Sequence, residues 1–296
     1  MKNRSPETKL KIALALTAVF AVVEVIGGTL SGSLALLSDA AHMFTDVSAL
    51  VIALTAIQLS KRVADVKRTF GYYRFEILAA VLNAVILILV AIYIFIEAYH
   101  RINKPTDIHI QGMFIIASIG LAVNLIGIKL LHHDSHKHLN VKGAYLEAWA
   151  DMLGAVGVIT AAIIIQFTGW RFVDSIIAIA IGLWVLPRAW TLLKESLNIL
   201  LEGVPEGIEL NAIHTVLSEV KGVLDVHDLH VWALTSGKIS LTVHLIVEEN
   251  NPNIQTILNS AAKLLEERFE ITHTTIQLET NHCGHDDLGK LDRKNK

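Results

Sequence analysis

The chain lacks most of the features that mark a secreted or a nucleic-acid-binding protein. Cys283 is the only cysteine among 296 residues, so an intramolecular disulfide is excluded. Only 18% of the residues are charged and the formal net charge is −3, so no strongly basic domain is present to bind nucleic acid. Instead, 53% of the residues are hydrophobic, whereas roughly 45–50% is usual in soluble domains even with glycine counted. The mean hydropathy of +0.51 agrees with this, and the composition predicts a membrane protein.

Six apolar segments of about 20 residues are each long enough to cross a hydrocarbon core of about 30 Å. They cover residues 10–30, 34–59, 76–98, 111–131, 143–167 and 172–193. The second loop is rich in lysine and arginine, and the fourth loop contains Lys137 and Lys142. Because basic residues concentrate on the cytoplasmic side, these loops and both termini are predicted to face the cytoplasm. Arg101 and Lys104 in the third loop are a mild counterexample. Residues 1–200 are therefore predicted to form a six-helix domain in the lipid bilayer.

A more polar region covers residues 201–283 and begins near the helix-breaking residues Gly203, Pro205 and Gly207. Its hydrophobic periodicity changes along the chain. The pattern predicts helices over residues 210–220 and 254–269, and strands over residues 223–234, 239–248 and 273–278. This region is therefore predicted to be a small α+β domain. The charged residues 284–296 are predicted to be a disordered tail.

Two pairs of metal-binding side chains interrupt the apolar segments. His42 and Asp46 are four residues apart in the second segment, and Glu147 and Asp151 are four apart in the fifth. On a helix such residues differ by about 40° around the axis, so each pair points the same way from adjacent turns. Two facing helices would then supply four nitrogen and oxygen ligands in a closed, roughly tetrahedral site for a divalent cation.

These ionisable side chains also have a purely structural interpretation. They could cap helices, lie near the membrane interface or bond to one another as a polar network. No lysine or arginine lies inside the same two apolar segments to neutralise them. Because an ionisable group is costly in a membrane span, four of them in two pairs favour a cation-binding role. Metal ligands bind in their deprotonated forms, so such a site would exchange a metal cation for protons.

Three motifs resemble the cation diffusion facilitator family, and most closely its bacterial cobalt-zinc-cadmium resistance type. They are the segments Ser33–Asp46, Phe70–Leu78 and Asp151–Val158. The resemblance implies a homodimeric metal/proton antiporter of the cytoplasmic (inner) membrane, which is not an enzyme. It also implies a cytoplasmic domain with a metallochaperone-like, ferredoxin-like fold. In this family the transport site falls on the positions of His42, Asp46, Glu147 and Asp151.

Glu147 departs from the pattern, because many zinc-transporting members have histidine at this position. Three carboxylates around an ion of charge +2 leave about one net negative charge, which makes the site harder and more anionic. Zn²⁺ remains the expected cargo and Cd²⁺ or Co²⁺ is an alternative. The harder site also makes manganese or iron a candidate.

Two loops are further candidates for metal binding. The stretch Asp65–Tyr72 matches a loop that carries a histidine-containing site in some family members, but here it has lysine and arginine, so no metal is predicted there. The fourth loop contains a tract that either gathers metal near the cytoplasmic mouth or is simply a solvated polar loop. Its residues are His132, His133, Asp134, His136 and His138.

The resemblance also places regulatory metal in the α+β domain, on the positions of His227, His244 and Glu279. A further histidine partner of some members is replaced here by Gln277. Residues of the tail, His282, Cys283 and His285, could complete the set of ligands. The alternative is that the strand histidines are exposed polar residues without a metal.

Two other functions are alternatives to transport. An intramembrane metal-dependent hydrolase would use a buried metal to activate water, but neither a His-Glu-x-x-His motif nor a plausible nucleophile pair is present. A membrane metal sensor would use the α+β domain as its output, but that domain has no recognisable phosphotransfer or nucleotide-binding loop. Both alternatives predict no net metal flux.

Overall fold

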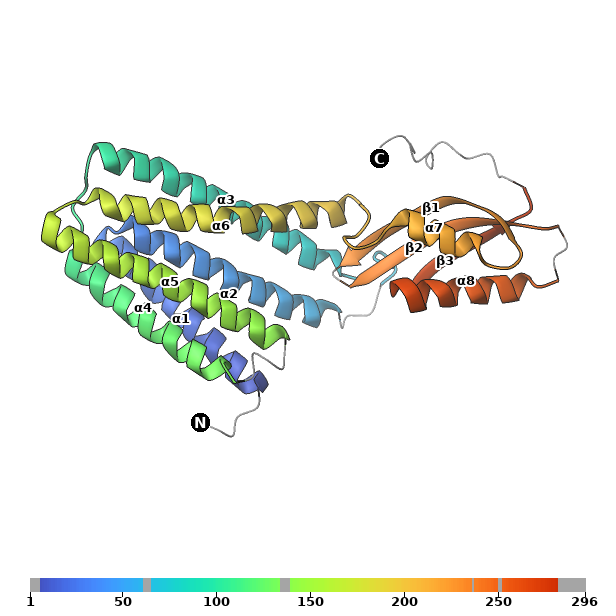
Figure 1. Cartoon of the computed structure of the whole chain (residues 1–296), viewed down its shortest axis with the longest axis horizontal. Helices are drawn as coiled ribbons and strands as arrows, with labels where there is room; N and C mark the ends of the chain where they lie inside the picture. The colour runs from blue at the N-terminus through green and yellow to red at the C-terminus, as the bar shows by residue number, and fades with distance from the viewer. Residues whose placement is uncertain (1–5, 61–64, 134–138, 236, 250–251, 282–296) are drawn as a thin grey trace. The chain divides into compact units, whose positions relative to one another are not determined.

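The computed structural model describes residues 6–60, 65–133, 139–235, 237–249 and 252–281 (Figure 1). Within these helices, the side chains of residues 6–7, 10, 46, 49–60, 139–141 and 143 lie outside the described part. The residues cluster into two compact units. One contains residues 1–54 and 80–193, and the other contains residues 55–79 and 194–296.

Six long helices precede the sheet, as the apolar segments predict. They are α1 (Pro6–Ser31), α2 (Leu34–Ser60), α3 (Arg74–Asn103), α4 (Ile110–Leu131), α5 (Leu139–Thr168) and α6 (Phe172–Leu200). Over their described residues, α1, α3, α4, α5 and α6 are long and apolar enough to cross a membrane. Helix α2 has 27 residues, but the side chains of most of its second half lie outside the described part. The chain is thus a multi-pass membrane protein with five candidate spans among the described residues.

The first two helices are joined by a tight turn at Gly32, whose φ of +70° is readily adopted only by a residue without a Cβ atom. Helix α2 then starts against α6. The carboxylate of Asp174 accepts hydrogen bonds from the backbone N–H groups of Leu34 (2.7 Å) and Ala35 (3.2 Å). The first N–H groups of a helix have no partner within the helix, so this carboxylate caps α2 from a distant part of the chain.

The helices are held together largely by small and aliphatic side chains. One buried cluster joins α2 to α6 through Leu34, Ala98, Met113, Ala161 and Ala178. Helix α4 packs against both α1 and α5. At the first of these contacts, a Cβ atom on Gly120 would lie 2.6 Å from the ring of Phe20, so only glycine permits this spacing.

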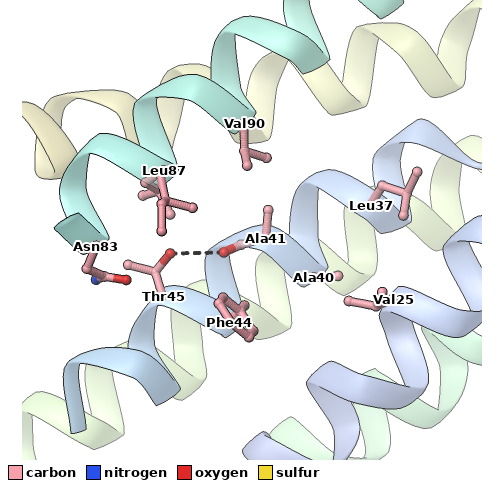
Figure 2. A pocket seen from close by; sticks show the side chains of 10 residues that line it. Val25, Leu37, Ala40, Ala41, Phe44, Thr45, Asn83, Leu87 and Val90 are labelled. Carbon is pink, nitrogen blue, oxygen red and sulfur yellow. Dashed lines mark hydrogen bonds between the residues drawn. The ribbon is translucent and has the colours of Figure 1, made fainter. Parts of the chain in front are cut away.

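A recess of about 140 Å³ lies between α1, α2 and α3 (Figure 2). It is lined almost entirely by apolar side chains, and Thr45 and Asn83 are the polar members of the lining. The hydroxyl of Thr45 is occupied, because it donates to the carbonyl of Ala41 at 3.0 Å. Among the side chains that the structure describes, no charged one lines this recess.

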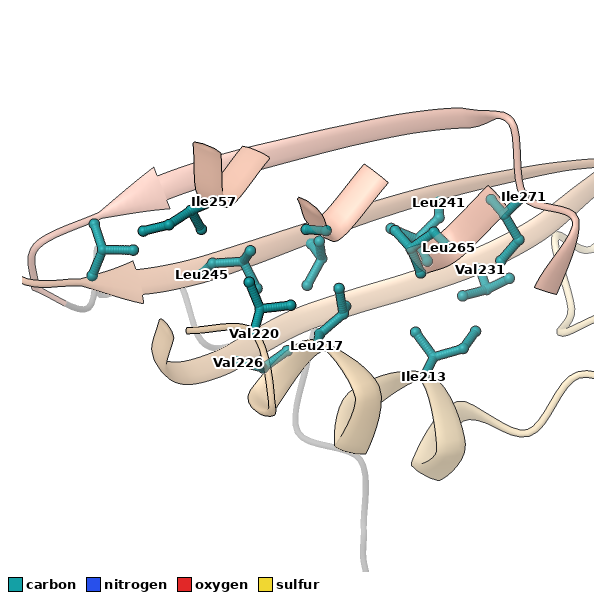
Figure 3. Close-up of a cluster of buried hydrophobic side chains, with 13 residues drawn as sticks. Ile213, Leu217, Val220, Val226, Val231, Leu241, Leu245, Ile257, Leu265 and Ile271 are labelled. Atoms are coloured by element: carbon teal, nitrogen blue, oxygen red, sulfur yellow. The ribbon is translucent and has the colours of Figure 1, made fainter. Parts of the chain in front are cut away.

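The C-terminal elements are α7 (Leu210–Ser218), β1 (Val223–Thr235), β2 (Lys238–Val247), α8 (Ile254–Phe269) and β3 (His273–Glu279). Strand β2 lies in the middle of the sheet, antiparallel to β1 and parallel to β3. Both helices direct apolar side chains, among them Leu217 and Leu265, toward the sheet residues Val231 and Leu245 (Figure 3). The predicted α+β domain with its five elements is present. That this domain has a metallochaperone-like fold stays a prediction.

The segment that leads into α3 packs on the same unit as the sheet. Arg74 forms an ion pair with Glu202 at 2.7 Å. The hydroxyl of Thr235 at the end of β1 donates to the carboxylate of Glu76 at 2.6 Å. In addition, Lys238 Nζ lies 2.6 Å from the hydroxyl of Tyr73 and 3.8 Å from the centre of its ring.

Candidate metal centres

Three of the four ligands predicted in the membrane helices lie together. His42 Nε2 is 3.3 Å from Glu147 Oε1 and 3.7 Å from Asp151 Oδ1. The side chains of His42 and Asp151 are only 7% and 4% exposed, and that of Glu147 is 33% exposed. One potential ligand atom from each residue lies within 4.8 Å of the others. Such a group of nitrogen and oxygen atoms has the chemistry of a divalent-cation site.

Helices α2 and α5 bring these residues together although they are about a hundred positions apart. Met43, next to His42, is fully buried, which holds this part of α2 against the bundle. One turn after Asp151, a Cβ atom on Gly154 would lie 2.5 Å from Asp39 Oδ1 of α2. The absence of a side chain at residue 154 therefore allows α5 to approach α2 at the level of the candidate site.

The fourth predicted ligand, Asp46, belongs to α2 one turn after His42, but its side chain lies outside the described residues.

Arg188 of α6 is a further member of this group, which the residue pattern of the fifth apolar segment does not indicate. Its Nη1 atom lies 2.8 Å from Glu147 Oε1. The two apolar segments that carry the predicted ligands contain no lysine or arginine, but the sixth segment contains Arg188, and spacing along one helix does not show which residues of another helix lie beside it. At least one carboxylate of the membrane helices, that of Glu147, is therefore paired with a positively charged side chain of the protein.

A second group of candidate ligands lies on the sheet. His227 of β1 and His244 of β2 are directly paired across the strands, and their ring centres are 5.3 Å apart. Glu279 at the end of β3 reaches both histidines: Oε2 is 3.3 Å from His227 Nε2, and Oε1 is 3.0 Å from His244 Nδ1. The Glu279 side chain is only 7% exposed. Gln277 donates to Glu279 Oε1 at 2.7 Å, so it supports this carboxylate.

Asp228 is a further acidic neighbour of this group that the sequence analysis did not single out. The strand pairing is irregular between His227 and His230, and Asp228 has a φ of +50°, which is uncommon for a residue with a side chain. Its carboxylate lies 3.6 Å from His244 Nε2 and 2.9 Å from His230 Nε2. The bulge in β1 therefore turns Asp228 toward histidines on two strands, which alternation along a regular strand would not predict.

The structure describes only some of the remaining candidate residues. His282, Cys283 and His285 lie outside the described residues, as do Asp134, His136 and His138 of the fourth loop. His132, at the C-terminal end of α4, has its Nδ1 atom 3.3 Å from the hydroxyl of Tyr145. In the loop after α2, the carboxylate of Asp65 accepts hydrogen bonds from the Tyr72 hydroxyl (2.6 Å) and from the backbone N–H groups of Lys67 and Arg68.

The order of domains matches known protein families. Residues 10–201 match the family model described as the cation efflux transmembrane domain. The chain belongs to the cation efflux family. Residues 205–281 match a second family model, described as the cytoplasmic domain of cation efflux proteins. The resemblance drawn from the motifs is therefore confirmed, and so is the predicted activity, efflux of divalent metal cations.

Several curated members of the cation efflux family are similar over nearly the whole chain. The metal cation efflux system protein CzcD of Cupriavidus metallidurans is 57% identical over 94% of this chain and 88% of its own. The cadmium, cobalt and zinc/H(+)-K(+) antiporter of Bacillus subtilis is 42% identical over 94% of this chain and 90% of its own. The zinc transporter ZitB of Yersinia pestis is 41% identical over 96% and 91%. These relatives are transport proteins, which agrees with the expectation that the chain is not an enzyme.

Proposed function

We propose that the chain moves zinc, with cadmium or cobalt as alternatives, out of the cytoplasm in exchange for protons. The site that carries this exchange consists of His42, Asp46, Glu147 and Asp151. The main observation in its favour is that His42, Glu147 and Asp151 converge from α2 and α5, with two of the three almost fully buried. The names of the relatives, which include zinc, cadmium and cobalt, support the choice of metals.

Proton exchange follows from the chemistry of the ligands. A cation binds the unprotonated imidazole of His42 and the ionised carboxylates, so metal entry releases any protons held there. When the metal leaves, protons return to the same atoms, because buried carboxylates without a cation are costly to keep ionised. One group of side chains thus binds either the metal or protons. Inward proton movement then drives metal in the opposite direction.

Six membrane spans, with both termini in the cytoplasm, fit this function best. The length of α2 supports a sixth span beside the five candidates, and the basic residues of the second loop support the orientation. We place the chain in the cytoplasmic membrane, with residues 1–200 as the transport domain and residues 201–283 as a regulatory and dimerisation domain.

The second group of candidate ligands, on the sheet of the C-terminal domain, is proposed to bind a regulatory metal ion that stabilises a homodimer. His227, His244 and Glu279 would be its ligands, and His282 and Cys283 of the tail would complete the set. The name of the matching family model, which marks a dimer domain, supports the dimer. Alanine at both His227 and His244 should change how transport depends on metal concentration. Unchanged dependence would leave this group without a regulatory role.

Transport into proteoliposomes with an imposed pH gradient tests the main proposal. The native chain should move zinc, cadmium or cobalt, and flux should stop when the pH gradient is collapsed. Asp151→Asn and Asp46→Ala should abolish the flux. The matched control is Asp107→Asn, since Asp107 is 91% exposed and pairs with Arg171 away from the candidate site. Metal binding without any flux would instead favour a membrane metal sensor.

A further inference from the structure

Arg188 makes its contact on an oxygen atom that the metal site also needs. Its guanidinium lies 2.8 Å from Glu147 Oε1, and His42 Nε2 lies 3.3 Å from that same oxygen. A metal ion that used Glu147 Oε1 would therefore have to share it with the arginine or displace it. Arg188 comes from α6, whereas the candidate ligands come from α2 and α5.

The position of Arg188 is supported from its own helix. Its guanidinium carbon lies 6.0 Å from the ring centre of Trp184, one turn earlier on α6. A guanidinium over the face of an indole ring is attracted by the electron density of the ring. The indole ring therefore lies beside the guanidinium on the same helix that brings Arg188 to Glu147.

The charge of Arg188 matches the excess charge of the ligand set. Three carboxylates and a neutral histidine leave one net negative charge around an ion of charge +2, and one arginine reduces that charge to zero. Unlike histidine or lysine, arginine does not lose its proton in proteins. The positive charge is consequently present in both the metal-loaded and the protonated states.

We propose that Arg188 is a specificity-determining residue of the transport site, which restrains Glu147 and so disfavours hard cations such as Mn²⁺. This inference rests on the proposed site of His42, Asp46, Glu147 and Asp151. Mn²⁺ depends on carboxylate oxygens and has the weakest intrinsic affinity of the first-row series. Zn²⁺ gains more from the imidazole of His42, so it loses less when one carboxylate oxygen is engaged by arginine. An acidic site thereby keeps its preference for zinc-like ions.

The test measures apparent KM values for Zn²⁺ and Mn²⁺ in proteoliposomes that contain the full chain. Arg188→Gln should lower the KM for Mn²⁺ roughly fivefold and change that for Zn²⁺ less than about twofold, as expected for the loss of one partly exposed ion pair. Arg188→Lys, which keeps the charge, should preserve the native Mn²⁺ to Zn²⁺ ratio. Arg188→Met is a second neutral variant in case the glutamine variant does not reconstitute.

Two controls separate this role from general effects of charge or folding. Arg171→Gln removes an arginine that also pairs with a carboxylate, Asp107, at 2.6 Å. It should leave the KM ratio unchanged. In a Glu147→His background, where an uncharged ligand replaces the carboxylate partner of the arginine, Arg188→Gln should no longer change the ratio.

Two results would overturn the inference about Arg188. One is a KM ratio that changes no more in Arg188→Gln than in Arg171→Gln. The other is a change of the same size in the Glu147→His background. Asp151→Asn distinguishes this failure from failure of the proposed function. Normal flux in Asp151→Asn would refute the site itself, whereas abolished flux together with an unchanged KM ratio in Arg188→Gln would refute the arginine's role alone.

Discussion

The carboxylate of Asp174 accepts a 2.6 Å hydrogen bond from the hydroxyl of Ser33, which lies 141 positions earlier in the chain. Asp174 is fully buried and also accepts hydrogen bonds from the first backbone N–H groups of α2. One side chain of α6 therefore fixes the start of the helix that carries His42. Loss of this carboxylate would leave several buried donors without an acceptor.

Asp174→Ala should therefore destabilise the transmembrane domain by about 1–3 kcal/mol, the usual cost of leaving a buried polar group unsatisfied. The measurement is thermal unfolding of the purified chain in detergent. Asp174→Asn should be milder, since its amide oxygen still accepts. Asp107→Ala, which changes an exposed aspartate, should leave the unfolding temperature unchanged. Equal effects of Asp107→Ala and Asp174→Ala would contradict the capping role.

Glu147→His should shift the transport preference from manganese toward zinc. The change replaces a hard oxygen ligand by an imidazole and removes one negative charge from the site. A shift of roughly tenfold in the ratio of flux rates corresponds to about 1.4 kcal/mol of differential stabilisation. The measurement compares zinc and manganese uptake into proteoliposomes. If the ratio stays at its native value, Glu147 does not contact the transported ion.

Removal of metal should lower the thermal stability of the cytoplasmic domain in the native chain. It should have no such effect in a variant that lacks the metal-binding histidines of this domain. A ligand present at a hundred times its Kd stabilises the folded state by about 2.7 kcal/mol. Zinc should thus raise the unfolding temperature of the native chain, and a chelator should reverse the rise. His227→Ala combined with His244→Ala should abolish the dependence on zinc. His214→Ala on α7 is the control, because that histidine lies outside the candidate group.

Tyr72→Phe should raise the pKa of Asp65. In the native chain the Tyr72 hydroxyl, followed by the N–H groups of Lys67 and Arg68, holds the pKa of this carboxyl below its usual value. A lowered folded-state pKa means that this contact contributes to stability above the ordinary carboxyl pKa of about 3.9 and that the contribution is lost as the pH falls through the folded pKa. Carbon-13 NMR titration of the carboxyl, identified with Asp65→Asn, measures the change. An unaltered pKa in Tyr72→Phe would show that the backbone donors alone are responsible.

The cytoplasmic elements followed their sequence patterns closely. Helix α8 covers Ile254–Phe269, the range predicted from its periodicity, and β3 ends one residue later than predicted, at Glu279. Helix α8 buries Ile257, Ala261 and Leu265 at a spacing of four residues, and exposure alternates along β3, so the spacing of apolar residues in these elements reports the structure directly.

The ends of the membrane helices were predicted less well. Helix α3 covers Arg74–Asn103 although the apolar pattern indicates only residues 76–98, and α6 continues to Leu200 beyond the predicted residue 193. Hydropathy detects the part of a helix that suits lipid, whereas backbone hydrogen bonding continues into the polar residues on either side.

The sequence by itself determined the membrane class and the order of the helices and strands, and it predicted two pairs of candidate ligands, because each depends on composition or on spacing along one helix. Only the tertiary structure decided that His42 approaches Glu147 and Asp151, that Asp174 caps α2 and that Arg188 engages Glu147. These contacts depend on the rotation and depth of one helix relative to another. Packing between side chains that are distant in the chain determines this rotation and depth, so they cannot be predicted from local periodicity.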